Sequence, residues 1–323
     1  MKPHLLRWAT IASLTLISAP TLAADAGNYP NRQVTIIVPF NPGGGTDTTT
    51  RLLARKLGEA WGQSVVVENK PGAAGAIGAN DVARAKPDGY TLLMGNIGTQ
   101  AINPSLYKLP YNHETAFAPI TEVVELPLIL VVNPKSGIKS VDELIAAAKK
   151  DELFFSSSGA GSSMQLAAEL FQNDAGVKMA HVPFGGEGPA VTNVMGGQVN
   201  LSFATIMGSG QFVKQGALTG LAVSSSQRYP SFPDLPTVAE SGLAGFNSVS
   251  WVGLVAPAGT PQAIQEKIAK DVKTLLDDPS FSKVLIDQGG LPVGSTPAEF
   301  TKKINDDYQL YSKIIKDNKI EVQ

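Results

Sequence analysis

The fold is decided by the stretch Val34-Thr-Ile-Ile-Val-Pro-Phe-Asn-Pro-Gly-Gly-Gly-Thr-Asp47 and the segment that follows it. Residues 34–38 are mostly β-branched and predict a strand, whereas Pro39 to Gly45 can neither continue it nor begin a helix. Residues 48–61 have helical spacing. Apolar side chains recur on one face of this predicted helix, at Leu52, Leu53, Leu57 and Trp61. The order is therefore strand, glycine loop, helix.

The three consecutive glycines, Gly43 to Gly45, have two possible roles. Without a Cβ atom they let backbone N–H groups face outward, ahead of a helix N-terminus whose partial positive charge favours an anion. This predicts an anion-binding loop. The alternative is that the glycines only allow a tight connection between strand and helix. The local sequence leaves both readings open.

The N-terminus predicts export. Lys2 and Arg7 precede the apolar run Trp8 to Ile17, and small residues follow as far as Ala23 and Ala24. This is the pattern of a secretory signal peptide, expected to occupy residues 1–24 and to be removed. The apolar run is too short to cross a bilayer.

Composition limits the compartments in which the protein is expected and the partners that it is expected to bind. The chain has no cysteine, so neither a disulfide nor a lipid-bearing cysteine is expected. Without residues 1–24 the formal net charge is −4, because two basic residues and no acidic ones are lost. Nucleic acid is therefore not an expected partner. We expect a freely diffusing monomer in the bacterial periplasm, with secretion into the medium as the alternative.

Strands and helices alternate along the chain, and several strands are followed by glycine-rich loops. Tyr90 to Met94 precedes Gly95 to Gln100, and the stretch Leu153 to Leu166 repeats the order of apolar strand, glycine and serine loop, and helix. In parallel sheets, ligands bind beyond the carboxyl ends of the strands. A mature length of roughly 300 residues more often forms two domains than one. The fold class predicted is therefore α/β, with two lobes facing each other across a cleft.

Two apolar segments suit strands that cross between the lobes. Ala118 to Val132 is one, expected to be broken by Pro127, and Ser248 to Pro257 is the other. The first lobe is accordingly expected to comprise residues 25–125 and 247–323, and the second lobe residues 126–246. Helices are predicted over Gln262 to Leu276 and Pro297 to Ile315.

The residue patterns do not predict an enzyme. Only His113 and His181 remain in the mature chain, at no metal-ligand spacing, so no metal site, cofactor or catalytic residue is predicted. The loop Gly159 to Ser163 does not match Gly-x-Ser-x-Gly, and the nucleotide-binding glycine motifs are incomplete. Asp47 is expected to be mainly structural, in the first turn of its helix and four residues before Arg51.

Several stretches in order resemble one known family. They are Tyr29-Pro30, Val38-Pro-Phe-Asn-Pro-Gly-Gly-Gly-Thr-Asp47 with Arg51, Val67-Glu-Asn-Lys-Pro-Gly-Ala-Ala-Gly75 with Gly78, Pro87-Asp-Gly-Tyr-Thr-Leu92, and Ala256-Pro-Ala-Gly-Thr-Pro261. From about residue 29 to the C-terminus the chain resembles the Bug family, the substrate-binding proteins of tripartite tricarboxylate transporters. The resemblance implies a type II-like Venus flytrap, with a mostly parallel sheet in each lobe, that delivers a small carboxylate to membrane permease subunits.

The resemblance also implies that loop backbone, hydroxyls and water hold the carboxylate. The motif carries this role to Phe40, Gly43, Gly44, Thr46 and Asp47, and to Ser158, Gly159, Gly161, Ser162 and Ser163. Neighbouring residues at strand ends complete the predicted ligand-binding set: Asn41, Asn96, Thr99, Ala160, Phe184, Gly185, Ala204 and Thr205.

One departure from the family pattern affects the ligand. Many relatives have a Tyr-Lys-Gly-type sequence after the strand that ends at Pro183, whereas this chain has Phe184-Gly-Gly-Glu187. The lysine is missing and an acid lies nearby, which argues against a polyanion such as citrate. With Phe40, Phe184 and Trp251 as candidate contacts or core residues, the expected ligand is a mono- or dicarboxylate, compact or aromatic. The alternatives are a sensory protein with a membrane partner and an enzyme acting on a small acid.

Overall fold

The computed structural model describes residues 26–317, so the predicted signal peptide lies outside the described residues. The strands are β1 (Val34–Val38), β2 (Val65–Asn69), β3 (Thr91–Asn96), β4 (Phe117–Val132), β5 (Leu153–Ser157), β6 (Met179–Pro183), β7 (Leu201–Thr205), β8 (Thr219–Val223), β9 (Val249–Pro257) and β10 (Leu291–Pro292). The α-helices are α1 (Gly45–Trp61), α2 (Ala76–Ala83), α3 (Asn103–Leu106), α4 (Val141–Lys150), α5 (Ser163–Ala175), α6 (Glu187–Gly196), α7 (Ile206–Lys214), α8 (Gln262–Leu276), α9 (Pro279–Gln288) and α10 (Pro297–Asp317). None of these helices combines the length and the apolar character needed to span a lipid bilayer.

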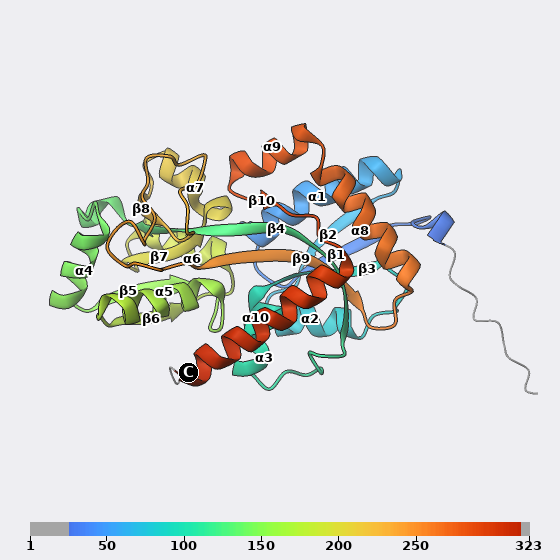
Figure 1. Ribbon diagram of the computed structural model, residues 1–323, viewed down its shortest axis with the longest axis horizontal. Coiled ribbons are helices and arrows are strands. Elements are labelled where there is room, and N and C mark those ends of the chain that lie inside the picture. Colours follow the sequence, from blue (N-terminus) through green and yellow to red (C-terminus); the bar gives the residue numbers. More distant parts are fainter. Residues whose placement is uncertain (1–25, 318–323) are drawn as a thin grey trace, which may run out of the picture.

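The strands form one continuous sheet whose order is β2-β1-β3-β9-β4-β7-β5-β6, with β8 and β10 also paired to β4. At one end β1 is parallel to β2 and β3, and at the other β5 is parallel to β6 and β7. The long strands β4 and β9 pair with each other antiparallel and run between the two ends (Figure 1). Helices cover both ends, so the chain forms two α/β parts joined by these strands.

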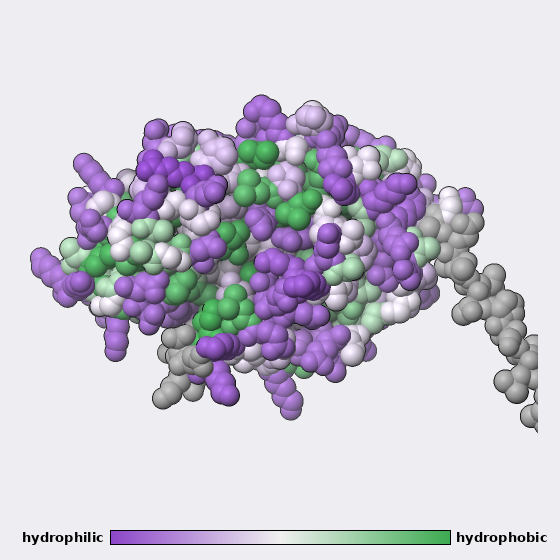
Figure 2. Space-filling view, viewed as in Figure 1, coloured by the Kyte–Doolittle hydropathy of each residue, from purple (hydrophilic) through white to green (hydrophobic). Residues whose placement is uncertain are grey.

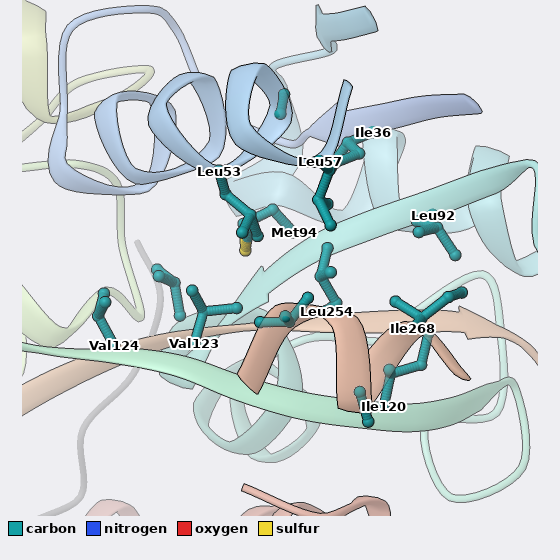
Figure 3. Close-up of a cluster of buried hydrophobic side chains, with 14 of the residues drawn as sticks. Ile36, Leu53, Leu57, Leu92, Met94, Ile120, Val123, Val124, Leu254 and Ile268 are labelled. Atoms are coloured by element: carbon teal, nitrogen blue, oxygen red, sulfur yellow. The ribbon is translucent and has the colours of Figure 1, made fainter. Parts of the chain in front are cut away.

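Each part has its own buried apolar side chains. One cluster near β1 and α1 joins residues from the first 126 positions to residues of β9, α8 and α9, and Figure 3 shows Leu53 and Leu57 of α1 lying toward Met94 and Leu254. Another joins strands β5, β7 and β8 to helices α4 and α5, including Phe155, Phe171 and Phe203. Burial of these large side chains provides the main driving force for folding of each part.

Strand β4 corrects one expectation. Pro127 does not break it, and the strand runs unbroken from Phe117 to Val132. Up to Pro127 the strand pairs with β9, and from Leu128 onward it pairs with β7. The missing N–H of the proline therefore falls where the partner strands change, a position at which a ladder hydrogen bond can be lost.

Helix boundaries differ from the prediction in two places. Helix α1 begins at Gly45 and not at Thr48, because Gly44 takes an extended conformation as N-cap and its carbonyl accepts from the Thr48 N–H at 2.9 Å. Helix α7 covers a segment for which no helix was predicted. A Cβ at Gly208 would lie 2.5 Å from Cδ of Glu187, so close packing explains that glycine.

Candidate functional site

The glycine loop between β1 and α1 is held in place by Asp47. This carboxylate is buried and accepts hydrogen bonds from the Gly43 N–H at 3.1 Å and from the Asn69 side chain at 3.0 Å. Arg51, one helical turn later, pairs with it at 3.0 Å, as predicted. Asn69 also donates to the carbonyl of Phe40. Asp47 thus joins the loop, the helix and the end of β2, which supports its structural reading.

The loop between β5 and α5 is shaped in a similar way. Gly159 and Gly161 have φ values of 132° and 77°, which favour glycine. The Gly161 N–H donates to the side chain of Gln165 at 2.7 Å. Ser162 caps α5 by accepting from the Gln165 N–H at 3.3 Å.

The two loops meet at a pair of small cavities. The first, of about 30 Å³, is lined by Phe40, Asn41, Gly44, Thr46, Asp47, Asn96, Leu126, Ser158, Ser163, Met164, Glu187, Thr205 and Ser250. The second, of about 10 Å³, is lined by Phe40, Ala74, Asn96, Gly98, Asn103, Ser158, Gly159, Ala160, Gly161 and Ser162. Most of the predicted ligand-binding residues therefore lie around one point between the two parts of the fold, which we call the loop site.

Five predicted residues line neither cavity: Gly43, Thr99, Phe184, Gly185 and Ala204. Thr99 is buried and bonds to the backbone of Asn96, while Ala204 is buried in an apolar cluster against which Phe184 packs. Trp251 is also a core residue, since its indole N–H donates to Asp307 at 2.7 Å.

The sequence interpretation missed several lining residues: Ala74, Gly98, Asn103, Leu126, Met164, Glu187 and Ser250. Ser250 and Asn103 carry no local signal, because nothing in their sequence neighbourhood distinguishes them from other polar residues of strands and helices. Glu187 did stand out as an acid near the expected lysine position. What it contacts could not be inferred.

Glu187 is the most unusual member of the loop site. Its carboxylate is buried and accepts from the Gly45 N–H at 2.7 Å, from the Thr205 hydroxyl at 2.9 Å and from the Thr205 N–H. Gly45 is the first residue of α1, and Thr205 caps α7. Burial raises the pKa of Glu187, and the three donors act in the opposite direction.

Direct contacts bring the two sides of the loop site together. The Asn41 N–H donates to the carbonyl of Gly185 at 3.2 Å, and the Tyr107 hydroxyl donates to the carbonyl of Ala160 at 2.7 Å. Pockets that hold small molecules usually measure roughly 300–1,000 Å³. A cavity of about 30 Å³ is too small for an organic acid, so the loops must separate to admit one and can close around it afterwards.

A larger groove lies elsewhere, between α5 and α10. It measures about 580 Å³, and its lining includes Leu166, Leu170, Leu310 and Tyr311. Apolar residues gather in the middle of the face drawn in Figure 2, between the two parts of the fold. Neither glycine loop lines this groove, whose polar lining residues include Glu169, Gln172, Asn173 and Lys178.

Two features of the described residues bear on catalysis, the lack of a metal-ligating cluster and a contact between a serine and a histidine. Between residues 26 and 317 no three His, Asp or Glu side chains gather as they would around a metal ion. The Ser157 hydroxyl lies 2.6 Å from Nε2 of His181, but Ser157 is buried and also donates to the Gly159 carbonyl. Burial lowers the pKa of His181 to about 4. This pair holds the start of the loop between β5 and α5 in place and presents no accessible nucleophile.

Comparison with known proteins agrees with this geometry. Residues 49–320 match the family described as the tripartite tricarboxylate transporter family receptor, TctC. The protein BugT of Bordetella pertussis (strain Tohama I) is 36% identical over 305 residues, which cover 93% of each chain. Among solved structures, R. palustris Rpa4515 with adipate has a TM-score of 0.88 and 34% identity, covering 90% of this chain and 98% of that one.

The periplasmic binding protein BugD has a TM-score of 0.87 and 34% identity, and the match covers 91% of this chain and all of BugD. These neighbours share the α/β architecture of a two-lobed periplasmic binding protein, and the family consists of solute receptors. The chain therefore belongs to the tripartite tricarboxylate transporter receptor family, together with the Bug proteins.

Proposed function

We propose that this chain is a periplasmic solute-binding protein that closes on a small organic carboxylate at the loop site. The acid is then delivered to the membrane permease of a tripartite transporter. After removal of the signal peptide the protein acts as a free monomer in the periplasm, and it does not alter its ligand. The lobes proposed are residues 25–125 with 247–323, and residues 126–246.

One observation carries this proposal. The loops after β1 and β5, which lie far apart in the sequence, converge with the first turns of α1 and α5 on the same small cavities. None of the described residues that line these cavities is Lys or Arg. A carboxylate would be held by backbone N–H groups, hydroxyls and helix N-termini, each hydrogen bond contributing roughly 1.5–3 kcal/mol.

Free hydroxyls support the same reading. Within residues 26–317, the side-chain oxygens of Thr46, Ser158 and Ser163 make no hydrogen bond to other protein groups, although all three residues line the first cavity. They can therefore donate to a ligand without breaking an existing contact. The related protein Rpa4515 was solved with adipate, an acid of the expected class.

The proposal is tested by thermal-shift screening of the mature protein against a library of carboxylates. A ligand at 100 times its Kd should add about 2.7 kcal/mol of stability. Replacing the bound carboxylate by its neutral amide should weaken binding by at least about tenfold, or 1.4 kcal/mol. An amide that binds as well as the acid would contradict anion recognition, and chemical conversion of a bound acid would favour an enzyme.

Closure has its own test, because a ligand shared by two lobes gains contacts on both sides only in the closed form. We expect the free protein in solution to be more open than the structure described above, so small-angle X-ray scattering should show a smaller radius of gyration when the ligand found in the screen is added at saturation. An unchanged radius, together with unchanged protection of the loop-site amides from hydrogen exchange, would argue against a flytrap mechanism.

A further inference from the structure

We propose that Glu187 makes the loop site selective for acids with a single carboxylate and an uncharged second end. This inference rests on the proposed function and specifies its ligand class. It starts from the position of the Glu187 carboxylate, which is itself an anion bound between the N-termini of two helices.

The surrounding chain is built around that carboxylate. A Cβ at Gly44 would lie 2.7 Å from Cβ of Glu187, and a Cβ at Gly208 would lie 2.5 Å from its Cδ. Both positions therefore need glycine as long as Glu187 keeps this place. Every protein group that hydrogen-bonds to the carboxylate is a donor, from Gly45 or Thr205, which is the arrangement that an ionised acid requires.

The same contacts remove donors that a ligand could have used. The N–H groups of Gly45 and Thr205 and the Thr205 hydroxyl are committed to Glu187. The hydroxyls on the lining of the first cavity that have no protein partner among residues 26–317 belong to Thr46, Ser158, Ser163 and Ser250. The donors directly beside Glu187, at Gly45 and Thr205, are therefore not available to a second carboxylate of the ligand.

Charge acts in the same direction. Asp47 and Glu187 are the acids on the cavity lining, and Asp47 is paired with Arg51. No ion pair among the described residues includes Glu187, so its charge is balanced only by dipoles. Two carboxylates brought together in a site with little water repel strongly. A ligand with a neutral second end avoids this repulsion.

The experiment compares diacids with their monoamides, which have the same length and differ in one charge. Succinate, glutarate and adipate are each paired with the corresponding monoamide, and Kd is measured by isothermal titration calorimetry on the mature protein. For the length that binds best, the wild-type protein should bind the monoamide at least about tenfold more tightly than the diacid. In Glu187→Gln this ratio should fall by about tenfold or more.

Two further variants make the result specific. Glu187→Ser removes the carboxylate with a smaller side chain, and it replaces Glu187→Gln if that variant does not fold. Glu122→Gln is the matched control, because Glu122 is also a buried acid but lines neither cavity. The control should keep the wild-type ratio.

The outcomes distinguish the selectivity role of Glu187 from the proposed function, carboxylate binding. If wild-type protein binds a diacid as tightly as its monoamide, or if the Glu187 variants keep the wild-type ratio, the selectivity role of Glu187 is wrong while carboxylate binding stands. If folded wild-type protein binds none of the six compounds and no acid from the carboxylate library, the proposed function fails and the inference fails with it.

Discussion

Asp47→Ala should destabilise the protein, and the contacts of Asp47 give the magnitude. The substitution removes a charged acceptor from the Asn69 amide, worth roughly 1.5 kcal/mol, whereas the exposed Gly43 N–H can bond to water instead and contributes little. It also removes a favourable charge in the first turn of α1, worth about 0.5 kcal/mol. The ion pair with Arg51 adds only about 0.5 kcal/mol, because half of the Arg51 side chain is exposed. The expected loss of unfolding free energy is therefore about 2 to 3 kcal/mol.

Urea unfolding followed by circular dichroism measures this loss, and Arg51→Gln is the control. Because Arg51 is the solvent-exposed partner of the ion pair, its replacement should lower the unfolding free energy by less than about 1 kcal/mol. If Asp47→Ala costs no more than Arg51→Gln, the account of Asp47 as the residue that fixes the glycine loop is refuted. Retained stability with lost carboxylate binding would instead assign Asp47 to ligand recognition.

Three further predictions concern other contacts. Burial raises the pKa of Glu122 to about 7. The stability that the protonated Glu122 contributes to the wild-type protein below about pH 4.5 should therefore be lost as pH rises through 7. In urea unfolding at a series of pH values, the unfolding free energy of Glu122→Gln should rise relative to that of wild type by up to about 3 kcal/mol by pH 8. Gly44→Val should abolish carboxylate binding in calorimetry but keep the native circular dichroism spectrum, because its Cβ would meet the Glu187 side chain; normal binding would contradict this. Tyr107→Phe should weaken binding about fivefold, since it removes the hydrogen bond to Ala160, and an unchanged Kd would show that this bond does not support closure.

Local sequence patterns predicted much of the fold. Helix α8 has the predicted bounds, Gln262 to Leu276, and strand β1 covers the predicted residues 34–38. The pair formed by Asp47 and Arg51 was also correct. These features depend on periodicity and on contacts within one helical turn, which neighbouring residues determine. The loops after β1 and β5 could be placed near each other because strand ends in an α/β sheet share one edge.

The sequence also showed where an anion could bind, but not which anion is there. The Gly45 N–H was expected to face the ligand, and in the structure it donates to Glu187, 142 residues later in the chain. The same carboxylate accounts for the glycine at 208 in helix α7. Such contacts depend on how α6 packs against the N-termini of α1 and α7, because burial and donor geometry are set by distant segments. The sequence by itself thus determined the loops and the compartment expected for the protein, whereas only the tertiary structure decided that one of the chain's own carboxylates occupies the end of α1.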